Sequence, residues 1–107
     1  MTVKIQDFEK LDFKVGEVMR VDEVPKADKL YRLEVDIGGK QITLVAGLKK
    51  NYGKEDIVGK KIIVLTNLQP ATIKGITSEG MLLAAVDGDD ISLVTVDRDV
   101  KTGSDVA

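Results

Sequence analysis

Apolar and polar residues alternate along most of this chain, the pattern of strands with one buried and one exposed face. The apolar positions are mostly Val, Ile and Leu, and β-branched residues favour pleated sheet. Between two alternating stretches, Gly38-Gly39 suits a two-residue hairpin turn. The pattern predicts strands at residues 15–22, 31–37, 41–46, 60–66, 81–86 and 91–97, and short helices at residues 6–11 and 51–57.

This order of elements predicts an all-β fold, a five-stranded Greek-key barrel of the OB type with a helical element between the third and fourth strands. A length of 107 residues suits one hydrophobic core, so we assign residues 1–107 to a single domain. Gly16 lies inside the first strand and marks a site for a bulge or sharp bend. In an OB barrel two loops flank the ligand face, here residues 24–30 and 67–80.

Two residue types that carry much of enzyme chemistry are absent. The chain has no Cys and no His, which excludes disulfides, a thiol nucleophile, an imidazole base and the usual zinc ligand sets. No Ser has a candidate base partner, so we expect a non-catalytic domain that uses no cofactor and no metal. No apolar stretch is long enough to cross a bilayer, so we expect a cytoplasmic protein with no membrane partner.

Charge is distributed unevenly, although the formal net charge is only −2. Residues 1–25 carry a net −2, residues 26–74 a net +5 and residues 75–107 a net −5. A basic middle beside an acidic end favours a surface that faces a polyanion. The alternative is mixed surface charge that only keeps the domain soluble.

The segment of residues 67–80 is long for a connection between two apolar strands, and such loops are often functional. Asn67, Lys74 and Ser78 supply amide, ammonium and hydroxyl groups that suit phosphates, 2′-hydroxyls and base edges. In the shorter loop, Lys26 and Lys29 flank a tight turn. The alternative in both loops is that the polar side chains only satisfy the backbone or face solvent.

Two motifs that would indicate other chemistry fail on spacing. Residues 47–54 look like a phosphate-binding loop, but five residues rather than four separate the two glycines, and Glu55 stands where Ser or Thr is needed. Residues 87–90 lack the length and the terminal Glu of a calcium loop, so a hairpin turn is the better interpretation.

Five short motifs follow one another in the order and spacing of one known family. They are Lys-Ala-Asp-Lys-Leu at residues 26–30, Leu-Val-Ala-Gly-Leu at 44–48, Val-Gly-Lys-Lys at 58–61, Asn-Leu-Gln-Pro at 67–70 and Ser-Glu-Gly-Met-Leu-Leu-Ala at 78–84. With them the chain resembles the tRNA-binding domain family from about residue 8 to residue 106. This OB-fold module occurs at the C-terminus of many methionyl-tRNA synthetases, in synthetase cofactors and in free-standing dimeric tRNA-binding proteins. Residues 7–16 are most similar to the methionyl-tRNA synthetase branch, in its C-terminal or detached β-chain form.

The resemblance implies a structure-specific, largely sequence-independent tRNA binder that forms a homodimer and assists the catalytic chain of methionyl-tRNA synthetase. Dimeric relatives pair through segments outside the barrel, here residues 5–11 and 91–106. Carried over by motif, the RNA-facing residues are Asn67, Lys74, Ser78 and Met81, and the phosphate contacts are Lys26, Lys29, Lys49, Lys60 and Lys61.

The chain also departs from the family pattern. Val24 stands where relatives commonly have His, and residues 71–73 are Ala-Thr-Ile where relatives often carry basic residues, which predicts weaker tRNA affinity. Relatives that act as secretion chaperones leave open a peptide-binding, chaperone-like module, and a purely dimerising module is a further alternative. Two Phe and two Tyr are too few for a stacking platform, so binding would rest on phosphates, 2′-hydroxyls and tRNA shape.

Overall fold

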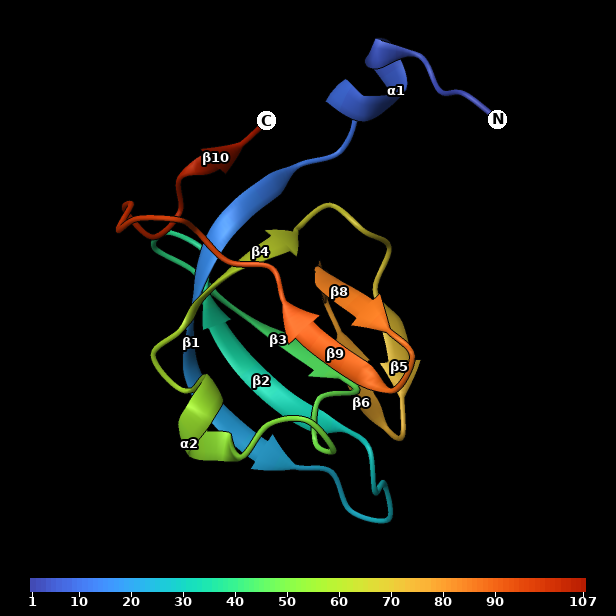
Figure 1. The fold of residues 1–107 in the computed structure, drawn as a ribbon, viewed down its shortest axis with the longest axis vertical. Coiled ribbons are helices and arrows are strands. Elements are labelled where there is room, and N and C mark those ends of the chain that lie inside the picture. Colours follow the sequence, from blue (N-terminus) through green and yellow to red (C-terminus); the bar gives the residue numbers. More distant parts are fainter.

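The computed structural model describes all of residues 1–107 and shows antiparallel strands that wrap into a nearly closed barrel (Figure 1). The main sheet has the strand order β3-β2-β1-β4-β7, with β10 added beside β1, and the pairs β5–β6 and β8–β9 form separate sheets. The predicted all-β barrel of the OB type is confirmed. The elements are α1 (Ile5–Glu9), β1 (Phe13–Glu23), β2 (Tyr31–Asp36), β3 (Gln41–Ala46), α2 (Lys54–Ile57), β4 (Lys61–Leu65), β5 (Ala71–Ile73), β6 (Ile76–Ser78), β7 (Met81–Leu82), β8 (Ala84–Asp87), β9 (Asp90–Leu93) and β10 (Asp105–Val106).

The barrel interior is filled mainly by branched aliphatic side chains. Alternate residues of β2 point inward, and Leu33 and Val35 are fully buried, which is the period of two that predicted the strand. Full burial of one such side chain contributes about 1.5–3 kcal/mol to folding. Helix α2 joins the core through Ile57, its only buried residue. The central cluster consists of Val18, Val21, Tyr31, Leu33, Val35, Ile42, Leu44, Ala46, Leu48, Ile57, Ile62, Val64 and Leu82.

Strand β1 is the long, bent strand that pairs with β2 and β10 along one edge and with β4 along the other. Its pairing with β2 shifts register between Val18 and Arg20, so the irregularity lies beyond Gly16, where a bulge or bend was predicted. Glycine is required at position 16 by packing instead, because a Cβ there would lie 2.6 Å from Cγ1 of Val35.

The strand predicted at residues 81–86 is divided in two. Strand β7 pairs with β4, whereas β8 leaves the barrel and pairs with β9. Leu83 lies at the change of partner: its N–H donates to the carbonyl of Ile63, and its carbonyl accepts from the N–H of Val94. Alternation of apolar residues marks a buried face but does not identify the neighbouring strand. The change of partner therefore could not be predicted.

Smaller differences lie at the ends of elements. The strand predicted at residues 91–97 ends at Leu93, and both helices are shorter than predicted. Residues 67–80, predicted as a loop, contain the β5–β6 hairpin. The predicted Gly38-Gly39 hairpin turn is confirmed, because it joins β2 to β3 with φ angles of 103° and 81°.

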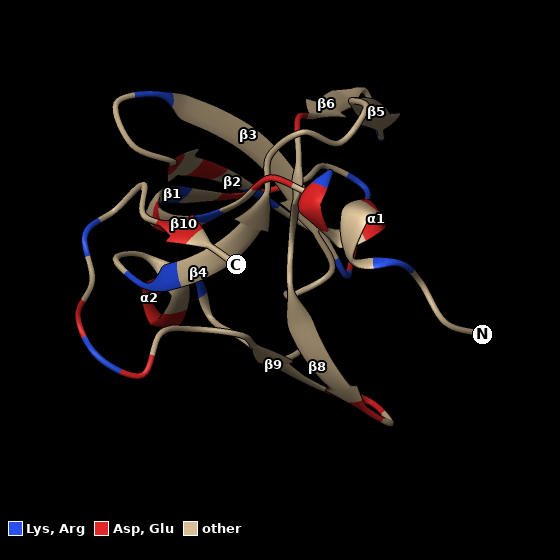
Figure 2. Ribbon diagram, turned by 90° about the horizontal axis from the view of Figure 1, so that it is seen from above, with Lys and Arg blue, Asp and Glu red and all other residues tan.

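The two ends of the chain lie at the same end of the molecule (Figure 1). Helix α1 projects from the barrel and has no buried residue. The C-terminal segment passes the β2–β3 turn, where Gly103 and Gly38 pack so closely that a Cβ on either would lie 2.7–2.8 Å from the other's Cα. On another side, the β8–β9 hairpin stands away from the main sheet with an acidic turn at its tip (Figure 2). Neither helix has the length or apolar character that a membrane crossing needs.

Candidate nucleic-acid interface

Two loops that are distant in sequence meet at the surface of the barrel. The β1–β2 loop and the turn between β5 and β6 together line a shallow cleft of about 340 Å³. Three of the predicted RNA-binding residues, Lys26, Lys29 and Lys74, line its walls. The structure thus brings together three lysines that the sequence places in the two loops expected to flank the ligand face.

Lys26 and Lys74 share an uncommon backbone conformation. Their φ angles are 62° and 51°, and no other non-glycine residue of the chain has a positive φ. Lys74 and Gly75 form the two-residue turn between Ile73 and Ile76. Turns of this type require a positive φ, which Asn adopts with little strain. A left-handed conformation costs a residue such as Lys about 1–2 kcal/mol. Strain of this kind gathers at functional sites, and here it sets the direction in which two lysine side chains leave the backbone beside one cleft.

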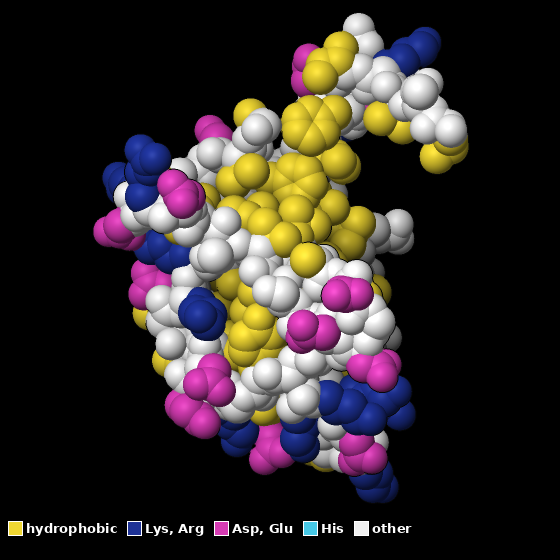
Figure 3. Space-filling view, in the orientation of Figure 1, with side chains coloured by type: hydrophobic (Ala, Val, Ile, Leu, Met, Phe, Trp, Pro, Cys, Tyr) yellow, Lys and Arg dark blue, Asp and Glu magenta, His cyan; other side chains and the backbone are white.

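The cleft lysines carry charge that nothing in the chain neutralises by direct contact. None of Lys26, Lys29 and Lys74 forms an ion pair with a carboxylate. Asp28 is the one acidic residue in the cleft. Basic side chains, with acidic ones between them, lie over the end of the molecule that carries the β1–β2 loop (Figure 3). This arrangement can bind an anion such as an RNA phosphate without first displacing a protein carboxylate.

Two other predicted phosphate contacts are already paired. Nζ of Lys49 lies 2.5 Å from the Glu23 carboxylate, which Nζ of Lys54 approaches at 3.5 Å. The hydrogen bond between Lys49 and Glu23 lowers the pKa of the Glu23 carboxyl and raises the pKa of the Lys49 ammonium. Nζ of Lys61 lies 2.6 Å from the Asp99 carboxylate. These lysines would have to exchange a carboxylate for a phosphate. Lys61 is the less available of the two, because its ammonium is only partly exposed and also donates to the carbonyl of Val100.

Asn67 ties the N-terminal segment to the end of β4. Its side-chain oxygen accepts a hydrogen bond of 2.9 Å from the N–H of Asp12, and its side-chain nitrogen donates one of 2.7 Å to the carbonyl of Lys10. The N–H of Thr66 also donates to the carbonyl of Asp12. The Asn67 side chain therefore already forms two hydrogen bonds within the protein. Its contact with RNA stays a prediction.

The Ser78-Glu79-Gly80 motif closes the barrel against β3. The buried Ser78 hydroxyl accepts a hydrogen bond of 3.2 Å from the N–H of Val45 and donates one of 3.0 Å to the carbonyl of Gly80. Glu79 is joined to Thr43 twice: its N–H donates to the Thr43 carbonyl at 2.8 Å, and its carboxylate accepts from the Thr43 N–H at 2.7 Å. This motif, one of those shared with the family, therefore holds strand edges together. An RNA contact of Ser78 stays a prediction.

The last two predicted residues are exposed but lie apart from the cleft lining. Met81 is on β7, opposite Leu65 of β4, and 37% of its surface is accessible. Lys60 follows α2, is exposed and forms no ion pair. Their contacts with RNA also remain predictions.

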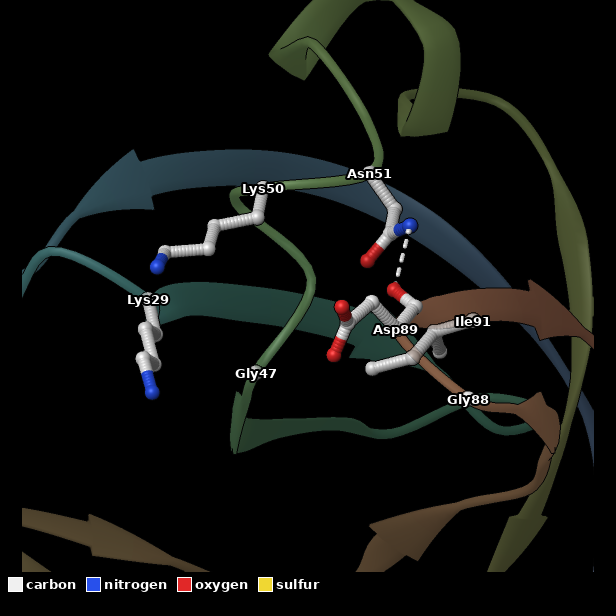
Figure 4. A pocket seen from close by; sticks show the side chains of 7 residues that line it. All are labelled: Lys29, Gly47, Lys50, Asn51, Gly88, Asp89 and Ile91. Atoms are coloured by element: carbon white, nitrogen blue, oxygen red, sulfur yellow. Dashed lines mark hydrogen bonds between the residues drawn. The ribbon is translucent and has the colours of Figure 1, made fainter.

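Lys29 lines a second cleft as well, with a volume of about 450 Å³ (Figure 4). Its other polar side chains are Lys50, Asn51 and Asp89. None of these three was assigned to a site from the sequence. The available signal was the Lys49-Lys50-Asn51 run shortly after β3, whereas Asp89 lies on a hairpin whose position relative to the barrel the sequence does not reveal.

The chain was compared with known families and curated proteins. A family model described as "Putative tRNA binding domain" matches residues 13–105. The chain is 49% identical over 104 residues to methionine–tRNA ligase of Nanoarchaeum equitans and 48% identical over 104 residues to that of Pyrococcus horikoshii. Both matches cover 97% of this chain but only 13% and 14% of those relatives. The chain thus corresponds to a small part of their length.

Solved structures show the same fold over the whole chain. A MetRS-related protein from Pyrococcus horikoshii has a TM-score of 0.93 and 32% identity, covering 100% of this chain and 99% of that one. The CsaA chaperone protein from Picrophilus torridus has a TM-score of 0.92 and 31% identity, covering 99% of this chain and 100% of that one. Because the family model covers nearly the entire barrel, the chain belongs to the tRNA-binding domain family and is related to the methionyl-tRNA synthetases.

Proposed function

We propose that this chain is a non-catalytic, cytoplasmic tRNA-binding module that assists methionyl-tRNA synthetase, as its C-terminal domain or as a detached chain. The observation that carries the proposal is the convergence of Lys26, Lys29 and Lys74 on one cleft with no carboxylate partner. The curated relatives, which are methionine–tRNA ligases, support the choice of tRNA as the polyanion and of the ligase as the enzyme that is assisted.

Recognition in this proposal is structure-specific and largely independent of sequence. Lysines contact phosphates, which are the same in every RNA, and few polar groups of the cleft suit base edges. Neutralising on the order of three to five phosphates gives weak binding that falls steeply as salt rises. Attachment to a synthetase, or pairing of two modules, raises the effective concentration and strengthens binding by roughly 10² or more.

We also propose that the chain forms a homodimer through the end of the molecule that carries both termini. Helix α1 exposes Ile5 and Phe8, and Leu11 after it is exposed too. These side chains continue into an apolar area on the adjoining end of the barrel (Figure 3). A five-residue helix is unstable alone and needs a packing partner. A second copy of the chain would supply the same apolar surface in return, as a two-fold interface requires.

A titration with tRNA at two salt concentrations tests the proposed function. Lys74→Glu should weaken binding about tenfold at low salt and reduce the salt dependence, because a phosphate contact is lost. The matched control is Lys40→Glu, which reverses an exposed, unpaired lysine beside the β2–β3 turn, at the end of β2 away from the cleft. Binding that is indifferent to salt and to Lys74→Glu would rule out the electrostatic mechanism.

A peptide-binding, chaperone-like module is the second candidate. It is favoured by TM-scores of 0.92 and 0.91 with two CsaA chaperone structures and by the absence of basic residues at positions 71–73. An unfolded apolar peptide distinguishes the two candidates. Peptide binding that persists at high salt, together with no tRNA binding at low salt, would favour the chaperone-like module.

A further inference from the structure

The second cleft, lined by Lys29, Lys50, Asn51 and Asp89, combines lysines and a carboxylate with a side-chain amide, which the lysine cleft lacks. Three separate parts of the chain form it: the β1–β2 loop, the segment that follows β3, and the β8–β9 turn. Ile91 and the two glycines Gly47 and Gly88 complete the lining, and a Cβ added at Gly88 would meet no atom within 4 Å. With no side chain at either position, a ligand can approach the backbone closely.

Hydrogen bonds fix these three parts against one another. The N–H of Lys49 donates to the carbonyl of Lys29 at 3.1 Å, which joins the two segments that carry lysines. The side-chain nitrogen of Asn51 donates to the carbonyl of Asp89 at 3.2 Å, which joins the β8–β9 turn to the segment after β3 (Figure 4). The cleft is therefore a preformed feature of the fold, and binding there costs little ordering of the chain.

Opposite charges face each other across this cleft without pairing. Figure 4 shows the ammonium groups of Lys29 and Lys50 on one side and the Asp89 carboxylate on the other. No ion pair joins Asp89 to either lysine. Because Asn51 uses its nitrogen to hold the turn, its side-chain oxygen remains an acceptor, and Figure 4 shows it directed toward the lysine side. A matching ligand has an anionic group on one side and a hydroxyl donor on the other.

We propose that this cleft binds one ribose-phosphate unit of RNA, with the phosphate at Lys29 and Lys50 and the 2′-hydroxyl donating a hydrogen bond to the Asp89 carboxylate. This inference rests on the proposed function, since it assigns a ribose-reading site to the same RNA-binding surface. An ionised carboxylate accepts hydrogen bonds but donates none, so it suits a hydroxyl and repels a bare phosphate. Deoxyribose has no 2′-hydroxyl to donate to the exposed Asp89 carboxylate, so DNA lacks this hydrogen bond and binds more weakly.

Lys29 connects this site to the lysine cleft, because it lines both. Lys26 and Lys74 line the lysine cleft together with Lys29, and Lys50 lines the second cleft, so these unpaired ammonium groups form a path across both clefts. A single RNA strand could place successive phosphates along this path. The lysine cleft also has a carboxylate, Asp28, but only the Lys50 end of the path adds a side-chain amide oxygen, that of Asn51, to its carboxylate. The reading of the 2′-hydroxyl is therefore assigned to the Lys50 end.

The test compares an RNA hairpin with the DNA hairpin of the same sequence, bound to wild type, Asp89→Ala and the matched control Asp90→Ala. Both substitutions remove one negative charge from the same turn, but only Asp89 lines the cleft. We expect Asp89→Ala to reduce the preference for RNA over DNA about fivefold, the effect of one lost hydrogen bond. Asp90→Ala should change the affinity for both hairpins equally and keep the preference.

A preference that is the same in Asp89→Ala and Asp90→Ala would overturn the ribose-reading site but leave tRNA binding intact. Wild type that binds neither hairpin nor tRNA would overturn the proposed function and this inference with it. Lys50→Gln supplies a second measurement: it should weaken RNA and DNA binding alike and lower the salt dependence by about one phosphate contact. RNA binding unchanged by Lys50→Gln would also contradict the site.

Discussion

The hydroxyl of Tyr31 donates a hydrogen bond of 2.8 Å to the main-chain carbonyl of Tyr52. The hydroxyl of Tyr52 in turn accepts one of 3.0 Å from the N–H of Leu93 in β9. Through these two contacts the tyrosines link the core strand β2 to the β8–β9 hairpin. Both rings pack in or against the core, so neither is presented for base stacking. The two tyrosines therefore serve the packing of the barrel, and the absence of aromatic stacking from RNA binding stays a prediction.

Tyr52→Phe should loosen the β8–β9 hairpin. The substitution removes the acceptor of the Leu93 N–H but keeps the ring, so we expect the free energy of unfolding to fall by about 1 kcal/mol. For a domain of this size the melting temperature should fall by roughly 4–8 °C. Hydrogen exchange measures the local effect: the Leu93 amide should exchange faster, whereas the Leu33 amide in β2 serves as the reference. Unchanged exchange at Leu93 would contradict a structural role for this hydroxyl.

Ser78→Ala should mainly lower the free energy of unfolding rather than weaken tRNA binding. The hydroxyl is buried and contacts Val45 and Gly80, so its loss leaves the N–H of Val45 without a partner and costs about 1–3 kcal/mol. Denaturant unfolding measures this cost, and tRNA titration of the same folded variant measures binding. If Ser78→Ala weakens tRNA binding while stability is unchanged, Ser78 contacts RNA as the family motif implies.

Lys74→Asn should make the chain more stable and a weaker RNA binder. Asn adopts a positive φ with less strain than Lys, so we expect a gain in the free energy of unfolding of about 0.5–1 kcal/mol. The variant also removes the ammonium group from the cleft, so tRNA affinity should fall. Lys74→Arg is the control that keeps both the charge and the strain. A stable Lys74→Asn variant with full tRNA affinity would show that the strained lysine serves no binding purpose.

The ion pair of Glu23 and Lys49 predicts a pH dependence. The pKa of Glu23 is lowered from 4.5 in the folded chain, so the unfolded chain takes up this proton first as the pH falls. The stabilisation by the carboxylate is therefore present above about pH 4.5 and is lost as the pH falls through the lower folded pKa. Denaturant unfolding between about pH 6 and pH 3 should show a smaller loss of stability for Glu23→Gln than for wild type. Glu9→Gln, which alters an exposed and unpaired carboxyl, should follow the wild type.

Phe8→Asp tests the proposed homodimer. The Phe8 ring packs beside Phe13 with centroids 6.4 Å apart, and its other surface is exposed at the proposed interface. A charge there should shift the molecule to a monomer in sedimentation at micromolar concentration, because an interface core excludes unpaired charge. Val86→Asp changes an exposed apolar residue on β8 instead and should leave the dimer intact. Wild type that sediments as a monomer would refute the dimer.

The barrel could be predicted because buried and more exposed residues alternate along its strands, most clearly in β2, whereas the last three residues of β3 are all buried. Lys26 and Lys74 are distant along the chain, so their closeness in space could be predicted only from the OB topology, which brings their two loops together. Their positive φ angles had no sequence signal, since Lys is not a residue that usually occupies such turns. Pairing of Lys49 with Glu23 was likewise hidden, because it depends on which strand ends meet.

The β8–β9 hairpin has a sheet of its own and shares no strand pairing with the barrel. A strand inside the barrel cannot gain or lose a residue without moving side chains to the opposite face. The Asp87–Asp90 turn is free of that constraint, so its length and acidity can change over evolutionary time while the core stays as it is. In our proposals this turn carries the one group that reads the sugar. Members of the family could therefore acquire or lose selectivity for RNA by altering a surface turn, with little risk to folding.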